Sequence, residues 1–171
     1  MVDAPSLLVA AELSAASLAA LPFIIHRYRI SRWMQKEPLQ PSGDGKKLGL
    51  TLVLPVWNEE KIIIKKLENL ASQDFPRKNL ELLIIDSAST DSTVSLAEGW
   101  LKKNGKEFPN HKLIRMEQRL GKTEAVKRAF DATADDKPLV AMTDADAMLA
   151  DKGALTRLVS WFDDSTIGAV G

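Results

Sequence analysis

Two aspartates separated by one alanine, Asp144 and Asp146, end a largely apolar run at residues 138–146. We expect this run to be a buried strand, in which side chains at positions i and i+2 point to the same side. Two carboxylates held close together repel each other unless a cation lies beside them. Mg²⁺ and Mn²⁺ are hard cations that bind carboxylate and phosphate oxygens. The pair therefore predicts a metal–diphosphate site, and the alternative interpretation is an aspartate-rich turn.

A second polar segment, Pro-Val-Trp-Asn-Glu-Glu at residues 55–60, also follows an apolar run. Pro55 ends the run, so Asn58 and Glu59 would lie where a strand meets the start of a helix. A carboxylate at that place can accept hydrogen bonds from two adjacent hydroxyls, such as those of a ribose. The alternative is that Asn58 only caps the helix and that Glu59 only suits its first turn.

Two more segments have residues that could contact a nucleotide. Asp86 begins the sequence Asp-Ser-Ala-Ser-Thr-Asp, whose carboxylate and hydroxyls can bind a base or a sugar. Gly121 and Lys122 stand at the start of a predicted helix, where backbone amides and a lysine can hold a phosphate oxygen. The chain has no G-x-x-x-x-G-K-[ST] sequence, so this is not a P-loop. The alternative is that Asp91 and its neighbours cap a helix and that Lys122 is an exposed cation.

Apolar runs that alternate with amphipathic segments predict the elements that would position these side chains. The order βαβαβαβαβ is typical of a doubly wound, mostly parallel α/β sheet. The carboxyl ends of parallel strands share one edge, where such sheets bind their ligands, so we expect the four polar segments to meet there. The predicted strands are residues 50–54, 80–85, 112–116, 138–146 and 167–171. The predicted helices are capped by or begin near Asn58, Ser89 or Thr90, Gly121 and Asp151, and the third has Ala125, Val126, Ala129 and Phe130 inward.

The N-terminal residues 7–25 are apolar except for Glu12, Ser14, Ser17 and Pro22. This stretch can cross a bilayer as a helix, which takes about 20 residues. Three arginines follow it closely, and positively charged flanks stay on the cytoplasmic side. The alternatives are an interfacial helix or a soluble helix packed on another domain. We predict a membrane anchor with its basic flank at 1–34, a linker at 35–47 and a cytoplasmic domain at 48–171, located at the cell membrane.

The composition excludes some classes of function. The 171 residues include 23 basic and 23 acidic side chains, so the net charge is zero. A nucleic-acid-binding domain would need a clearly basic face, and none is indicated. Cysteine is absent, which excludes a disulfide framework and a thiolate metal site. Hydrophobic residues make up 45%, which is enough for a packed core.

The four polar segments, in this order, resemble the motifs of family 2 glycosyltransferases with the GT-A fold. Residues 55–60 resemble the family's P-x-[YW]-N-E-E opening, and residues 86–93 resemble its D-D-x-S-x-D-x-T segment. Residues 121–129 resemble its G-K-x-x-A-L-N-x-G segment, and Asp144-Ala145-Asp146 matches its D-x-D motif. The resemblance covers about residues 48–171, which would be a truncated, Rossmann-like GT-A domain.

The resemblance implies a metal-dependent transfer of a sugar from a nucleotide-diphospho-sugar donor to an unknown saccharide, lipid or other acceptor. This chain would supply the donor-binding half, with Mg²⁺ or Mn²⁺ neutralising the departing nucleoside diphosphate. The implied positions are Pro55, Asn58 and Glu59 in the nucleoside pocket, Asp86 at the base or its ribose, Lys122 near the diphosphate, Asp144 at the ribose or at metal-bound water, and Asp146 on the metal.

Some family features are replaced or missing. Ser87, Lys127 and Ala129 stand where the family has aspartate, asparagine and glycine. The family's general base would lie beyond Gly171, so no catalytic base is assigned and we expect the 171-residue chain alone to be inactive. One alternative is a sugar-phosphate nucleotidyltransferase, which should have a glycine-rich basic loop after its first strand. The other is a non-catalytic nucleotide-sugar-binding module, which Ser87 favours.

Overall fold

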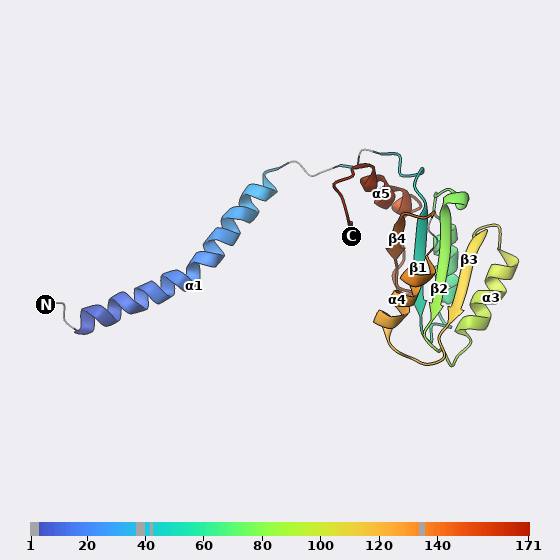
Figure 1. Ribbon diagram of the computed structural model, residues 1–171, viewed down its shortest axis with the longest axis horizontal. Coiled ribbons are helices and arrows are strands. Elements are labelled where there is room, and N and C mark those ends of the chain that lie inside the picture. The colour runs from blue at the N-terminus through green and yellow to red at the C-terminus, as the bar shows by residue number, and fades with distance from the viewer. Residues whose placement is uncertain (1–3, 37–39, 42, 134–135) are drawn as a thin grey trace. The chain divides into compact units, whose positions relative to one another are not determined.

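The computed structural model describes residues 4–36, 40–41, 43–133 and 136–171. The chain divides into two compact units, Met1–Gln40 and Pro41–Gly171. The first unit is built on one long helix, α1 (Ala4–Met34), and the second holds the sheet (Figure 1). Each unit is therefore described by itself.

The second unit is organised around a four-stranded sheet in which every strand pair is parallel. The strand order is β3-β2-β1-β4, so the central strands are β1 (Leu50–Val56) and β2 (Leu80–Asp86). The outer strands are β3 (Asn110–Arg115) and β4 (Leu139–Met142). The strand order reverses between β1 and β4. At such a reversal the chain segments that follow the two strands leave their carboxyl ends in opposite directions, and a crevice opens between them.

Helices cover both faces of this sheet, because the central strands have apolar side chains on both faces. On one face Leu52 and Leu82 pack in the same core as apolar residues of α2 (Ile63–Ala71), α3 (Thr93–Lys103) and α5 (Ala154–Ser160). On the other face Val53 and Leu83 pack against α4 (Lys122–Ala132). The 3₁₀-helices η1 (Arg77–Asn79) and η2 (Trp161–Asp163) complete the unit. The predicted doubly wound fold is confirmed.

Two predicted strands differ in the structure. The strand predicted at 138–146 ends at Met142, and both aspartates lie in the loop that follows. β4 alternates between half-buried and exposed side chains, because Leu139 and Ala141 pack against the core on one face of the sheet, whereas Val140 and Met142 lie on the other face and are exposed. Residues 167–171, predicted as a fifth strand, have no strand pairing in the described part of the chain, although Val170 and Gly171 line an apolar groove beside β4.

Helix ends and one helix face also differ from prediction. Asn58 does not cap α2, which begins only at Ile63, because Asn58 has a left-handed φ of 55° and binds a neighbouring loop. Likewise α3 begins at Thr93 and receives no cap from Ser89 or Thr90. Phe130 points outward, because α4 packs on the sheet through two small side chains, Ala125 and Ala129, that allow only a narrow contact.

The second half of the predicted linker packs on the folded unit. Gly45 is buried against α5, with a φ of 64° that favours glycine. A methyl group added there would collide with the carbonyl oxygen of Thr156 and lie 2.9 Å from the amide nitrogen of Ser160. Lys46 pairs with Asp74 at 3.0 Å nearby. The residues just before β1 are therefore held in place.

We expect Gly45→Ala to lower the free energy of unfolding by about 2–3 kcal/mol, because it combines backbone strain with a clash against backbone atoms. Gly99→Ala is the matched control, since Gly99 lies within α3 with no atom near the added methyl group. That change should raise the same free energy by about 0.5–1 kcal/mol. Urea denaturation of residues 41–171 measures both. Equal effects from the two changes would contradict the close packing of Gly45.

Candidate functional site

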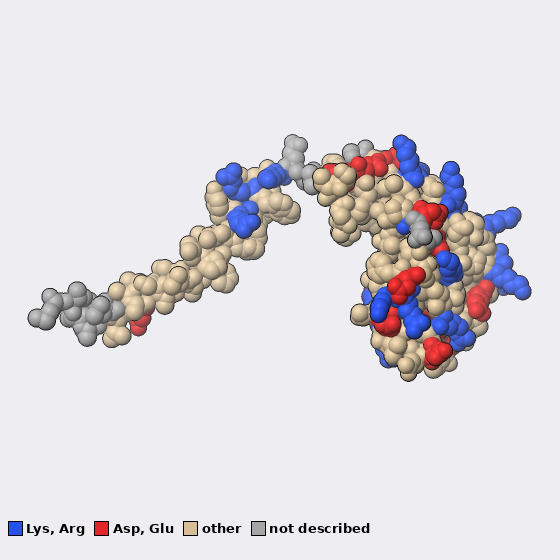
Figure 2. All heavy atoms as spheres, viewed as in Figure 1, with Lys and Arg blue, Asp and Glu red and all other residues tan. Residues whose placement is uncertain are grey.

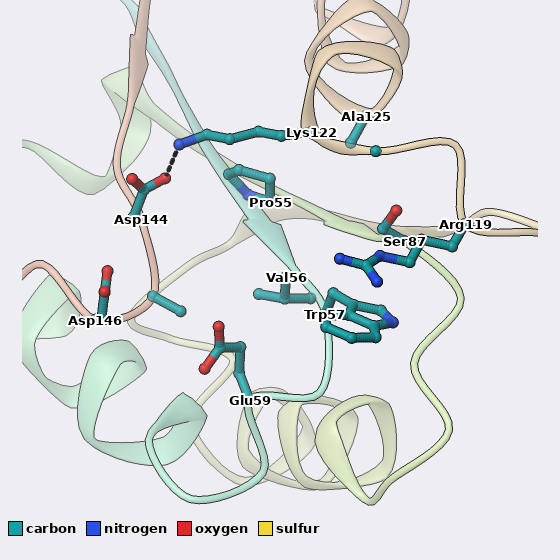
Figure 3. Close-up of a pocket in the computed structure, with 12 residues that line it drawn as sticks. Pro55, Val56, Trp57, Glu59, Ser87, Arg119, Lys122, Ala125, Asp144 and Asp146 are labelled. Carbon is teal, nitrogen blue, oxygen red and sulfur yellow. Dashed lines mark hydrogen bonds and ion pairs between the residues drawn. The ribbon is translucent and has the colours of Figure 1, made fainter.

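A cleft of about 280 Å³ opens at the carboxyl ends of β1 and β4, where the strand order reverses. The first residues of α4 form a further wall (Figure 3). The cleft brings together segments far apart in the sequence, as we expect where the carboxyl ends of parallel strands share one edge of a sheet. Its lining residues are Pro55, Val56, Trp57, Glu59, Ser87, Arg119, Gly121, Lys122, Ala125, Asp144, Ala145 and Asp146.

The two aspartates after β4 both lie on this cleft. Ala145 between them is buried and packs into the core, which turns its two neighbours toward the open side. Asp144 is half-buried and Asp146 is exposed. Figure 3 shows Asp144, Asp146 and Glu59 placed around the same opening. Three carboxylates from two loops therefore give this end of the cleft a negative character.

Lys122 supplies the opposing positive charge. Its Nζ lies 2.6 Å from Oδ1 of Asp144, and both side chains are about half exposed. Lys122 is the first residue of α4 and follows Gly121, whose φ of 87° suits glycine and turns the chain into the helix. An exposed ion pair of this kind is worth at most about 1 kcal/mol, so Lys122 can exchange Asp144 for a phosphate oxygen at little cost.

The loop that carries Glu59 is fixed by hydrogen bonds from the loop after β2. The backbone N–H of Asn58 donates to Oγ of Ser89 (2.9 Å), and the N–H of Thr90 donates to Oδ1 of Asn58 (2.8 Å). The N–H of Glu59 donates to Oγ1 of Thr93 (2.7 Å). These bonds hold the turn after β1 in place, and the Glu59 carboxylate points into the cleft (Figure 3).

Asp86 and Asn58 lie behind the cleft rather than on it. The Asp86 carboxylate is fully buried and accepts the N–H of Ser89 at 3.2 Å. Its Oδ2 also lies 3.8 Å from Nε of Arg115. The cleft thus gathers five of the seven residues predicted from the sequence, and these two hold the loops. Direct contact of Asp86 with a base or ribose stays a prediction.

The cleft also contains groups outside the seven predicted site residues. The Arg119 guanidinium lies over the Trp57 ring, 3.4 Å from its centre, which is a cation–π contact. Oγ of Ser87 is buried in the wall and has no hydrogen-bond partner among the described residues. Such an oxygen is unusual in a folded protein and suits a polar ligand. Both features border the part of the cleft opposite the acidic pair in Figure 3.

The ionisation of Glu59 reflects its surroundings. Burial, together with the negative charges of Asp146 and Asp91, raises the pKa of Glu59 above its ordinary value of 4.5. The folded protein therefore keeps a proton on Glu59 in a pH range where the unfolded chain has lost it. It follows that this group costs stability as the pH rises through its folded pKa.

We expect Glu59→Gln to be slightly more stable than the wild type at pH 7, by about 0.5 kcal/mol because solvent screens a partly exposed group. At pH 4, where Glu59 is mostly protonated in both states, the difference should vanish. Thermal melts at the two pH values measure this, with the exposed Glu117→Gln as control. A loss of stability at pH 7 would show that the carboxylate is not under electrostatic stress.

Comparison with known proteins identifies the family. A family model described as "Glycosyl transferase family 2" matches residues 51–171. The chain belongs to this family. One similar curated protein, from Methanococcus voltae, is "Dolichyl N-acetyl-alpha-D-glucosaminyl phosphate 3-beta-D-2,3-diacetamido-2,3-dideoxy-beta-D-glucuronosyltransferase", which is 41% identical over 70 residues, or 41% of this chain and 21% of that protein. Another, "Beta-monoglucosyldiacylglycerol synthase" of Synechocystis sp., is 32% identical over 121 residues, or 70% of this chain and 24% of that protein.

Solved structures agree with this assignment. The mannosyltransferase PcManGT from Pyrobaculum calidifontis, in complex with GDP-Man and Mn²⁺, superposes with a TM-score of 0.76 and 32% identity. The match covers 94% of this chain and 45% of that one. TarS of S. aureus (residues 1–349), in complex with UDP-GlcNAc, superposes with a TM-score of 0.60 over 72% of this chain and 36% of that one; at 24% identity it supports the fold alone. The chain spans about a quarter or less of the two curated relatives and less than half of these structures.

Proposed function

We propose that the cleft at the ends of β1 and β4 binds the nucleoside diphosphate of a nucleotide-sugar donor, for transfer of the sugar to an acceptor. The observation that carries this proposal is the convergence of an acidic pair, a lysine and Glu59 on one cleft in a family 2 glycosyltransferase. Ligands of open α/β sheets bind at this kind of strand reversal. A diphosphate also needs both a cation and hydrogen-bond donors, and the helix start with Lys122 supplies donors.

The donor set of the acidic pair fits Mg²⁺ or Mn²⁺. Asp144 and Asp146 offer only oxygen ligands, and in the described ranges no three His, Cys, Asp or Glu side chains lie close enough together to hold one ion by themselves. Such ions are commonly held by one or two carboxylates, with phosphate oxygens and waters completing the shell. When bound, the ion would offset the negative charge that develops on the departing diphosphate. A neighbour of similar structure contains Mn²⁺ with GDP-Man, which supports a divalent metal.

The side chains around the pair then have distinct tasks. Lys122 would move from Asp144 to a phosphate oxygen, and Glu59 would accept hydrogen bonds from ribose hydroxyls. Pro55 forms the wall of the nucleoside pocket. Asp86 and Asn58 hydrogen-bond to the loop after β2, so the loops after β1 and β2 are held against each other and Glu59 is kept in place. Each of these tasks is binding or orientation, and none requires a proton transfer by these residues.

The nucleotidyltransferase alternative receives no support. The turn after β1 contains no glycine, and the family model assigns the chain to glycosyltransferases. A non-catalytic binding module would use the same cleft, so release of the sugar from the donor by the intact gene product separates the two possibilities. The acceptor is a saccharide, a lipid or another molecule. The names of two relatives contain the lipid terms dolichyl and diacylglycerol, which favours a lipid-linked acceptor.

The membrane part of the proposal rests on α1. Residues Leu8–Met34 form a helix that is long and apolar enough to cross a membrane. Leu8, Leu13 and Leu18 are all exposed, and the apolar side chains lie on every side of the helix instead of one face. An interfacial helix would instead show a polar face. Figure 2 shows the basic side chains gathered near its C-terminal end, which favours the cytoplasmic side for the second unit.

Titration calorimetry with UDP and GDP, each with Mn²⁺ and then with excess EDTA, tests the proposed function. We expect binding with a 1:1 stoichiometry that EDTA weakens strongly, since the metal links the acidic pair to the diphosphate. Glu117→Gln serves as a control that should bind as the wild type does, because Glu117 is exposed and lies outside the cleft. If the wild-type chain binds neither UDP nor GDP, the proposal is wrong.

A further inference from the structure

One face of α2 has polar side chains directed at the segment that follows β4. Oδ1 of Asn69 accepts the N–H of Leu149 at 2.9 Å, and its Nδ2 donates to the carbonyl oxygen of Leu149 at 3.0 Å. Gln73, just after α2, donates through Nε2 to the carbonyl oxygen of Asp151 at 2.9 Å. Lys66 stands three residues before Asn69 on the same face. These side chains hold the backbone that leads away from the acidic pair.

Lys66 makes the contacts nearest to the acidic pair. Its side chain is 0% exposed, and its Nζ donates to Oγ1 of Thr143 at 2.7 Å and to the carbonyl oxygen of Ala147. Thr143 and Ala147 lie immediately before and after the stretch from Asp144 to Asp146. One ammonium group therefore fastens both ends of the short loop on which the acidic pair stands.

A buried ammonium is a costly way to fasten a loop. Removing such a cation from water costs several kcal/mol, and its two hydrogen-bonded partners here are neutral oxygens. Burial lowers the pKa of Lys66 below its ordinary value, and the nearby negative charges of Asp144 and Asp146 offset only part of this shift. Methionine would fill nearly the same space without the desolvation cost. The carboxylates are thus the charges that favour a cation at this buried position.

We propose that Lys66 is a positioning residue for the acidic pair: it binds Thr143 and Ala147 and so fixes Asp144 and Asp146 for a metal–diphosphate ligand. This inference rests on the proposed function and adds a residue to it. Lys66 is not among the residues that line the cleft. Its effect passes through the backbone of the loop and through its charge. Loss of such a supporting group typically weakens metal affinity by about 10–100-fold.

The test compares two substitutions on α2 in the full chain. Lys66→Met keeps the volume and removes both hydrogen bonds, and Asn69→Ala removes two hydrogen bonds to the same segment farther from the carboxylates. We expect Lys66→Met to weaken binding of UDP or GDP with Mn²⁺ by about tenfold or more. Asn69→Ala should lower the melting temperature yet change that affinity less than about twofold. Amide hydrogen exchange without ligand should accelerate at residues 144–147 only in Lys66→Met.

A second substitution covers the case in which Lys66→Met does not fold. Thr143→Val removes one hydrogen-bond acceptor of Lys66, keeps the shape of the side chain at position 143 and leaves the charge of Lys66 in place. It should weaken the same binding by a smaller factor, and adding it to Lys66→Met should produce little further loss. Unchanged affinity in Lys66→Met, or in Thr143→Val where only that variant folds, overturns the inference and leaves the proposed function intact. The inference is also overturned if Asn69→Ala loses as much affinity for the nucleotide as Lys66→Met does. A wild type that binds neither nucleotide overturns both.

Discussion

Asp146→Asn lowers the affinity of the chain for UDP or GDP in the presence of Mn²⁺ by at least about a hundredfold, because a metal ligand contributes several kcal/mol. The substitution should leave the fold intact. Asp146 is exposed, and within the described residues no hydrogen bond or ion pair involves its side chain. Surface changes of this kind usually alter stability by less than about 0.5 kcal/mol. Calorimetry and a thermal melt of the same preparation separate binding from folding.

The matched control is Asp131→Asn on α4, which removes one exposed carboxylate outside the cleft. It should bind both nucleotides as the wild type does. Asp144 is less suitable as the main test, because its removal also leaves Lys122 without the partner it has in the structure. Equal affinity of Asp146→Asn and the wild type, with Mn²⁺ present and EDTA absent, would contradict the assignment of the metal to this pair.

Removing residues 1–40 moves the protein from the membrane fraction to the soluble fraction. The full chain should stay in membranes after an alkaline wash, because α1 exposes apolar side chains over a membrane-spanning length. Residues 41–171 form a compact unit with their own core, so they should remain folded and soluble. Circular dichroism checks the fold, and fractionation measures the distribution.

A point substitution sharpens this result. Leu18→Arg places a charge in the middle of the apolar stretch, where insertion would cost about 2.5–3.5 kcal/mol more. We expect it to reduce the membrane-bound share. Leu120→Arg, at an exposed leucine of the second unit, should not change that share. A full chain that the alkaline wash releases would contradict membrane insertion and favour an interfacial or protein-bound helix.

Much of the sheet could be predicted because its strands are continuous apolar runs. β1 and β2 are buried on both faces, so the apolar runs at 50–54 and 80–85 mark them clearly. The outer strands were harder to bound, since β3 has polar exposed residues and β4 has one strand partner in the described ranges. Strand pairing is a non-local property, and for this reason residues 167–171 were assigned wrongly from their composition.

The cleft was predictable for a different reason. Parallel strands end at one edge, so Glu59, Lys122 and the acidic pair could be brought together without coordinates. Asn58 was assigned to its own helix, because a local pattern cannot reveal that its side chain binds the loop after β2. Lys66 was missed because a lysine on an amphipathic helix normally faces solvent. Only the folded loop after β4 explains why it is buried.

The direct test of the proposed metal–diphosphate site is a crystal structure of the chain grown with Mn²⁺ and a nucleoside diphosphate. Anomalous scattering locates the Mn²⁺ independently of the nucleotide. We expect a manganese peak bonded to a carboxylate oxygen of Asp146, with the diphosphate beside Lys122 and the ribose toward Glu59. A nucleotide bound elsewhere, or a cleft that holds the diphosphate with no metal at either aspartate, would contradict it.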